Sequence, residues 1–203
     1  TMILMSGLQF LVMDDDMMKM LPKNIESRVI WDSIQKDFGS TEIIYIAFGN
    51  KSKEIYTQDA FATLWDIANA LNNIKSVEGF SSLATQTKID NVDGLINAGE
   101  LQPKRLLELN EINDIKLYLE RNNKLKRRFV SKDDEFFLVT VEPIREIGLN
   151  EFRDQVIQVV EPLLNDYEAH FGGTAYMTGS IPGLIREDVK ALIKIGIFLM
   201  VLI

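Results

Sequence analysis

Residues 135–179 carry the pattern that decides the fold: EFFLVTVEPIREIGLNEFRDQVIQVVEPLLNDYEAHFGGTAYMTG. The segment opens at 135–142 with β-branched and aromatic residues, which predict a strand. Apolar side chains then recur at helical spacing over 150–169, which predicts a helix that Pro162 kinks because proline has no backbone N–H. A second strand is expected over 174–179, so the order of elements is strand, helix, strand.

An earlier segment repeats this order. The stretch TEIIYIAF at 41–48 predicts a buried strand, apolar spacing predicts a helix over 58–74, and 77–87 predicts a second strand bent at Gly79. Two such units in succession are the split βαβ pattern of ferredoxin-like sandwiches. Right-handed crossovers place both helices on one face of the sheet. We therefore expect an α+β fold built on a ferredoxin-like domain.

Other segments lie before the first unit and between the two units. We expect helices over 27–38 and 103–122, and a polar loop or a short helical turn over 88–102. A strand is expected over 126–131, and a polar turn at 132–134 joins it to the strand that follows.

The composition excludes several kinds of site. The 203 residues include no cysteine and one histidine, which excludes disulfides, thiolate zinc sites, cysteine nucleophiles and histidine-rich metal sites. The net charge of −8 argues against a broad nucleic-acid surface. His170 is expected at the end of the long helix, where the helix dipole favours a cation, and no nucleophile matches it. We therefore expect no enzyme activity, no cofactor and no metal.

The two charged clusters are interpreted as having no ligand: the basic run is expected to be solvated surface, and the acidic stretch is expected to be a segment where the chain leaves a membrane. Lys124, Lys126, Arg127 and Arg128 form a basic run, and such runs can bind nucleic acid or anionic lipid headgroups. No aromatic residues are interleaved and the chain is acidic, so a solvated turn is the expected structure. The stretch MDDDMMKM at 13–20 mixes ligand types for soft and hard metals, so it selects neither.

Both ends of the sequence are apolar. Residues 1–13 have no charged side chain, and residues 191–203 have only Lys194. Each stretch is too short to cross a bilayer, which needs roughly 20 helical residues. Both run to an end of the sequence, so we interpret them as parts of longer transmembrane helices. The expected organisation is the end of one such helix at 1–13, an extracytoplasmic domain at 14–180, and the start of the next helix at 181–203.

Three stretches resemble one family of membrane proteins. These are DDDMMKMLP at 14–22, VSKD at 130–133 with the strand after it, and YMTGSIPGLIRED at 176–188 with the apolar run after it. In this order the chain resembles the resistance-nodulation-division (RND) exporter superfamily, in its MMPL-like branch. The third stretch is the most specific of the three.

The resemblance implies a location and a role. The chain would be the substrate-handling porter domain of a proton-driven exporter in the bacterial inner membrane, on the periplasmic side. Its partners would be membrane lipid, a hydrophobic or amphiphilic substrate, the rest of the transporter and further copies of it, with no nucleic acid. The junction residues Asp14, Asp16, Pro22, Gly179 and Pro182 would transmit movement from the helices to the domain.

Other readings stay open. A protein-export accessory of the SecD/SecF type or a sterol-sensing Patched-like protein would share the RND architecture. A stand-alone ferredoxin-like ligand-binding or regulatory domain would use its apolar ends as a dimer interface. An enzyme is the third reading, because ferredoxin-like folds do host catalysis, but no nucleophile, base and oxyanion donor occur together here.

Overall fold

A computed structural model describes residues 22, 24–38, 42–92, 95–144, 148–178 and 192. The chain divides into two compact units, residues 1–39 with 185–203 and residues 40–184. In the first unit, the expected helix over 27–38 is confirmed as α3 (Glu26–Phe38). The sheet and every residue of the site described below belong to the second unit.

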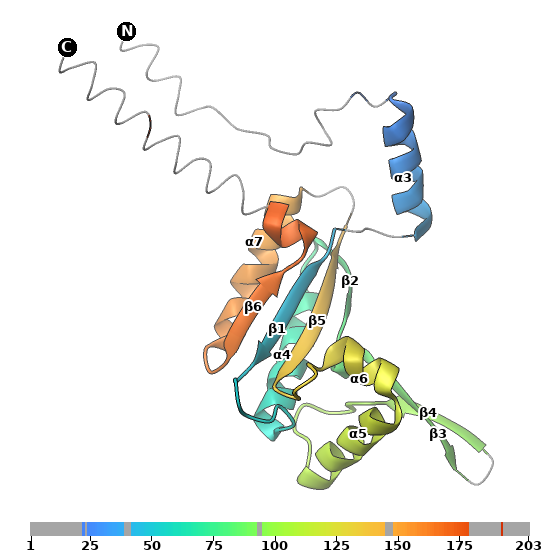
Figure 1. Cartoon of the computed structure of the whole chain (residues 1–203), viewed down its shortest axis with the longest axis vertical. Helices are drawn as coiled ribbons and strands as arrows, with labels where there is room; N and C mark the ends of the chain where they lie inside the picture. Colours follow the sequence, from blue (N-terminus) through green and yellow to red (C-terminus); the bar gives the residue numbers. More distant parts are fainter. Residues whose placement is uncertain are drawn as a thin grey trace, which may run out of the picture. The chain divides into compact units, whose positions relative to one another are not determined.

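The second unit is built on a four-stranded sheet. β1 (Ile44–Gly49) and β5 (Phe136–Pro143) are its central strands, and β2 (Val77–Ser81) and β6 (Glu168–Gly172) are its edges. The order is β2-β5-β1-β6, and every neighbouring pair is antiparallel (Figure 1). β1 and β2 therefore run parallel with β5 between them, and β5 and β6 run parallel with β1 between them. The mixed α/β class with an antiparallel sheet is confirmed.

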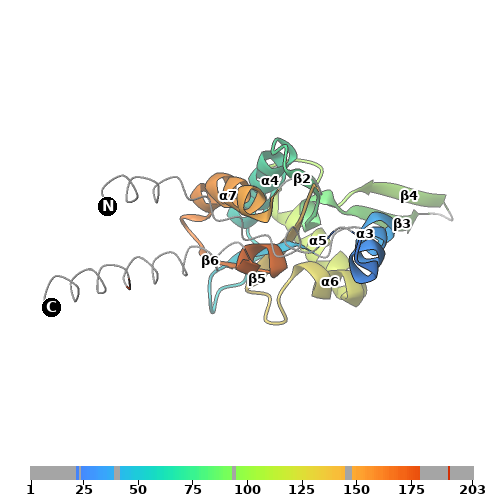
Figure 2. The ribbon, with the colours of Figure 1, turned by 90° about the horizontal axis from the view of Figure 1, so that it is seen from above.

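Two helices cover one face of this sheet. α4 (Gln58–Asn72) connects β1 to β2, and α7 (Leu149–Val160) lies between β5 and β6 along the chain (Figures 1 and 2). The Thr57 hydroxyl caps α4 by accepting a hydrogen bond from the backbone N–H of Ala60 at 3.2 Å. The core between these layers is almost completely buried: Ile44, Ile46, Phe48, Phe61, Leu64, Ile67, Leu71, Phe137, Val139, Val141, Phe152, Val156 and Val160.

A long insertion separates β2 from β5. It contains η2 (Leu83–Thr85), the strands β3 (Thr87–Val92) and β4 (Leu95–Glu100), and the helices α5 (Leu109–Arg121) and α6 (Asn123–Phe129). β3 and β4 pair with each other in a separate two-stranded sheet that extends away from the larger one (Figure 1). The loop or short helical turn expected over 88–102 is therefore wrong, because most of this stretch forms the hairpin.

The strand expected over 126–131 is also wrong. Residues 123–129 form α6, because Leu125 and Phe129, one helical turn apart, both turn inward. Only Val130 keeps an extended bridge, to Phe137 on β5. The polar turn at 132–134 is confirmed, but it joins a helix to a strand and not two strands.

The last helix and strand are displaced from their expected positions. The helix expected to reach 169 ends at Val160, and residues 161–164 continue as the 3₁₀ helix η3 (Glu161–Leu164) with Pro162 in its first turn. The final strand is β6, whereas residues 174–178, expected as a strand, are helical. Proline has no N–H with which to extend an α-helix, so the chain turns early and enters the sheet sooner.

Two glycines allow backbone segments to approach each other closely at the two ends of β1. A Cβ on Gly49 would lie 1.9 Å from the carbonyl oxygen of Glu135, at the point where β1 meets the start of β5. Gly173, just after β6, has φ of +99°, and a Cβ there would lie 2.2 Å from the carbonyl oxygen of Ile43. Both positions need glycine because backbone approaches backbone there.

Most of the predicted junction lies outside the described residues. This holds for Asp14, Asp16, Gly179 and Pro182, for the apolar segments, and for the predicted boundaries at 14, 180 and 181. Pro22 is described; it is exposed, and its carbonyl accepts a hydrogen bond from Ile25 N at 3.3 Å before α3 begins. Among the described residues, none of the helices has the length and apolar character that crossing a bilayer requires.

Candidate binding site on the open face of the sheet

The face of the sheet opposite α4 and α7 carries apolar side chains. Along β5 the side chains alternate, so Phe137 and Val139 enter the core while Phe136 and Leu138 project to the other face. On β1, Ala47 pairs with Leu138 on one side and with His170 on the other. We call this surface the open face. Phe136 and Leu138 are only half-buried there.

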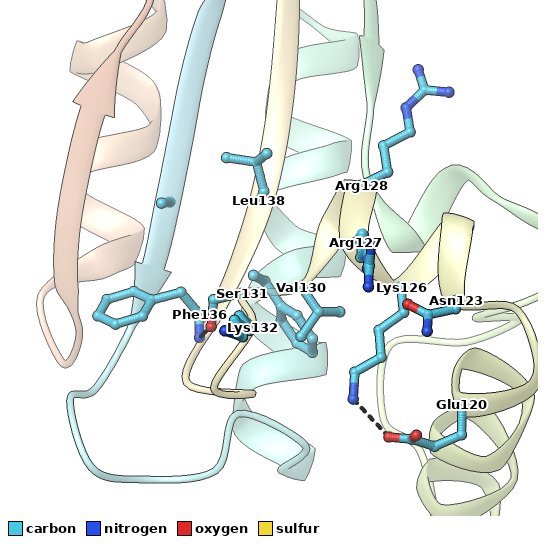
Figure 3. Close-up of a pocket in the computed structure, with 12 residues that line it drawn as sticks. Glu120, Asn123, Lys126, Arg127, Arg128, Val130, Ser131, Lys132, Phe136 and Leu138 are labelled. Atoms are coloured by element: carbon cyan, nitrogen blue, oxygen red, sulfur yellow. Dashed lines mark hydrogen bonds and ion pairs between the residues drawn. The ribbon is translucent and has the colours of Figure 1, made fainter.

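A cavity of about 660 Å³ lies between the open face and α6 (Figure 3). Its apolar wall consists of Ala47, Val130, Phe136, Phe137 and Leu138, which come from β1, β5 and the end of α6. This volume is typical of sites for small molecules. The cavity is the candidate functional site.

The opposite wall of the cavity is polar and basic. It is formed by α6, the turn after it and one residue of α5: Glu120, Asn123, Lys126, Arg127, Arg128, Ser131 and Lys132. In Figure 3, Lys126 points toward Glu120, whereas Arg128 extends away from the other side chains. The four cations of this wall therefore have different surroundings.

The positive charge of Lys126 is balanced by two carboxylates of the protein. Its Nζ lies 2.6 Å from Glu120 Oε1 and 2.9 Å from Asp134 Oδ2, and its side chain is 17% exposed. The hydrogen bonds to Glu120 and then to Asp134 raise the pKa of Lys126 above its ordinary value. Lys126 thus links α6 to α5 and to the turn after α6. Its charge is compensated by Glu120 and Asp134.

The remaining cations of the wall have no such partner in the part of the chain that the structure describes. Arg127, Arg128 and Lys132 are exposed, and no described carboxylate forms an ion pair with any of them. The Arg128 guanidinium lies 5.3 Å from the centre of the Phe129 ring, a cation–π contact that leaves its charge uncompensated. The cavity therefore combines an apolar wall with unpaired positive charge, on a chain whose net charge is −8.

The turn after α6 positions the cavity wall. Ser131 Oγ accepts hydrogen bonds from the backbone N–H groups of Glu135 and Phe136, at 3.0 and 3.1 Å. Ser131 N donates to the Phe136 carbonyl at 2.9 Å, and Asp134 adopts a left-handed φ of 58°. These bonds hold the turn closed, so Lys132 and Phe136 stay at the same end of the cavity.

The Asp134 carboxylate links this turn to the core. Besides its pair with Lys126, it accepts a hydrogen bond from Tyr56 Oη at 3.3 Å. Burial, followed by the charge of Asp134, raises the pKa of the Tyr56 hydroxyl well above its ordinary value. Tyr56 therefore stays neutral and serves as a donor.

His170 is not where the sequence placed it. It lies in β6 on the open face, with Nε2 3.1 Å from Glu168 Oε1 and its ring 5.6 Å from the ring of Phe136. Its side chain is 58% exposed, so the expected position at a helix end is wrong. Among the described residues, no three histidine, aspartate or glutamate side chains gather as a metal site. The cavity beside α6 offers apolar and cationic groups that a ligand could contact.

A second cavity differs in its charge. It measures about 520 Å³ and is lined in part by Glu54, Asp59, Asp166 and Arg105. The guanidinium of Arg105 is held by Asp66 through two hydrogen bonds of 2.7 Å. Its arginine is thus already paired, and its lining carries several carboxylates. We therefore place the candidate site at the cavity beside α6.

The sequence interpretation missed this site. The basic run was expected to be a solvated turn, but three of its residues line the cavity from α6, and only Lys124 does not. The available signal was the apolar pair Leu125 and Phe129, whose spacing predicts a helix that turns this pair inward and leaves the cations around the rest of its surface.

The comparisons with known proteins add no family to this picture. No protein-family model matches the chain, and no curated protein matches it either. The resemblance to the RND superfamily therefore stays a prediction that rests on the three quoted stretches of sequence.

Proposed function

We propose that residues 44–172 form a ferredoxin-like domain that handles amphiphilic molecules as part of an RND-type, MMPL-like membrane exporter. Two features of the fold support the first half of this proposal. The units β1-α4-β2 and β5-α7-β6 share one antiparallel sheet, and both helices lie on one face of it. This is the arrangement expected of a split βαβ sandwich.

The observation that carries the handling of amphiphiles is the cavity beside α6. An amphiphile needs an apolar surface for its tail and polar groups for its head. Phe136 and Leu138 supply the first, while Arg127 and Lys132 supply the second. The cavity is open to solvent, so a molecule can enter and leave without local unfolding.

In the proposed exporter the domain acts mechanically, with no enzyme activity and no cofactor. It stands on the periplasmic side of the bacterial inner membrane and moves as a rigid body when attached helices move. Asp14, Asp16, Pro22, Gly179 and Pro182 are the proposed points at which this movement is transmitted. Lipid, the remaining transporter and further copies of it are its proposed partners.

The test is export by the full-length protein in bacterial cells. A flexible Gly-Ser stretch inserted at 179–182 should abolish efflux of a fluorescent amphiphile while the protein stays in the membrane at normal level. The same stretch inserted between β3 and β4, which lie outside the four-stranded sheet, is the control and should leave efflux unchanged. Efflux that survives the insertion at 179–182 would contradict mechanical coupling.

A second candidate is a binding or regulatory domain without transport, which the same cavity would also serve. It predicts that the unaltered protein binds amphiphiles but drives no efflux, with or without a proton gradient. Efflux that collapses when the gradient is removed would reject this candidate in favour of the exporter.

A further inference from the structure

We propose that the cavity beside α6 selects an amphiphile with an anionic headgroup, held by Arg127 and Lys132. The inference rests on the proposed handling of amphiphiles and adds the charge of the ligand, its orientation and the residues that choose it.

The charge follows from the distribution of ion pairs around the cavity. Lys126 is compensated by Glu120 and Asp134, so it adds no net charge for a ligand to meet. Arg127 and Lys132 lack any ion pair with a described carboxylate, and both line the cavity. A cationic head would meet repulsion there, and a neutral head would leave both charges uncompensated. An anionic head satisfies them with charge-assisted hydrogen bonds.

The orientation follows from the register of the strands. Arg127 comes from α6, whereas Lys132 lies beside Ser131 and Phe136 at the turn before β5, and the apolar side chains of β5 and β1 continue across the sheet from that turn (Figure 3). Ala47 lies between Leu138 and His170 in the sheet, and its small side chain leaves room between these larger neighbours. A tail that runs over Ala47 contacts Leu138 and Phe136 on its way.

Nucleic acid fits the cavity less well. Its phosphates also seek arginine and lysine, but single strands are held by successive aromatic side chains along a broad positive groove. Here Phe137 is fully buried, so Phe136 is the one accessible phenylalanine among the described lining residues, and the chain is acidic. An oligonucleotide is therefore the competitor that the experiment must test.

The experiment is photolabelling of the full-length protein in membranes. The probes share one twelve-carbon tail with a photoreactive group and differ only in the head, which is phosphate, carboxylate, trimethylammonium or maltoside. The two anionic probes should label peptides that contain Ala47 and Leu138, and the cationic and neutral probes should label them weakly. Equal labelling by all four heads would overturn the inference.

Charge reversal sharpens the test. The double variant Arg127→Glu, Lys132→Glu should lose about tenfold or more of the anionic labelling and gain labelling by the trimethylammonium probe. Lys124→Glu is the matched control: it removes an exposed lysine of the same helix that does not line the cavity, so labelling should not change. A gain confined to the cationic probe separates recognition from misfolding, because apolar surface exposed by misfolding would take up all four probes.

Two competitors complete the design. An unlabelled alkyl phosphate should displace the phosphate probe, whereas inorganic phosphate and a single-stranded oligonucleotide should not. Displacement by inorganic phosphate at equal concentration would mean a site for free anions, and displacement by the oligonucleotide would mean a nucleic-acid site; either result would overturn the inference. Cavity labelling without head preference leaves the proposed function standing, while no cavity labelling by any probe rejects both.

Discussion

The two faces of β5 carry similar side chains in opposite surroundings. Phe137, Val139 and Val141 face the helices and are 0–1% exposed, while Phe136 and Leu138 face the cavity and are half-buried. Phe136 and Phe137 are adjacent and chemically identical, yet only Phe137 contacts the aromatic core. The difference shows that apolar side chains in this strand either pack in the core or line a cavity, and the proposed binding uses only the second group.

The largest expected effect is on the buried face. The Phe137 ring lies 5.1 Å from the ring of Phe61 and 6.0 Å from the rings of Phe48 and Tyr56. Phe137→Ala should lower the free energy of unfolding by about 3–5 kcal/mol, measured by urea titration with tryptophan fluorescence. Phe136→Ala is the control and should cost about 1 kcal/mol or less. Equal losses would mean that the two faces do not differ as described.

The second largest effect is expected at Gly49, the last residue of β1, which lies against the start of β5. Gly49→Ala places a Cβ against the Glu135 carbonyl, so the start of β5 and the turn before it must move. We expect a loss of about 1–3 kcal/mol, together with weaker photolabelling of the cavity, because that turn carries Lys132. Gly79→Ala is the control: a Cβ there meets no atom within 4 Å, so stability and labelling should hardly change.

A smaller effect is expected at the boundary of the cavity. Lys126→Met removes both ion pairs and should cost about 1 kcal/mol, since the carboxylates that it pairs with stay partly hydrated. Because pairing raises the pKa of Lys126 above 10.5, its contribution is fully present below pH 10.5 and is lost as the pH rises through the raised value. Lys124→Met should leave the unfolding curve unchanged at neutral pH.

The smallest effect is visible only in alkali. The pKa of Tyr56 is raised from 10.0 in the folded state, so above pH 10 the unfolded chain releases this proton while the folded one keeps it. The unaltered protein should therefore lose stability faster above pH 10 than Tyr56→Phe does. Parallel curves for Tyr56→Phe and the unaltered protein would contradict the assigned burial.

The sequence predicted the central elements of the fold well. Alternation and β-branched residues located β1 and β5 to within a few residues, and helical spacing after Thr57 located α4. Each of these segments has a long apolar pattern that fits either the period of a strand or the period of a helix, but not both. The strand order could not be predicted from the pattern of any one segment, because it depends on which strands pair with each other in the folded sheet.

Local rules of turn chemistry explain the main errors. Asp93-Gly94 separates the paired residues Val92 and Leu95, and such a dipeptide between two extended stretches is a strong hairpin signal that the expected loop overlooked. At the other end, Tyr167, Ala169 and Phe171 alternate with more polar residues at strand period. Continuing the helical pattern past Pro162 hid this alternation and placed His170 wrongly.

The cavity could not be predicted from sequence neighbours. It joins Ala47 of β1, residues of α6 and Phe136 of β5, which meet only when the sheet has formed. The distinction between Lys126 and Arg127 is equally spatial. Both belong to one basic run, but only Lys126 reaches Glu120 and Asp134.

The place of β1 at the centre of the sheet has a consequence for synthesis. Its two partners, β5 and β6, are encoded far downstream, so a chain that leaves the ribosome presents β1 with both edges open until most of the domain has been made. Pairing across such sequence distances is slow, and unpaired apolar strands aggregate meanwhile. Production of this domain should therefore depend on chaperones and on growth temperature more strongly than its final stability suggests.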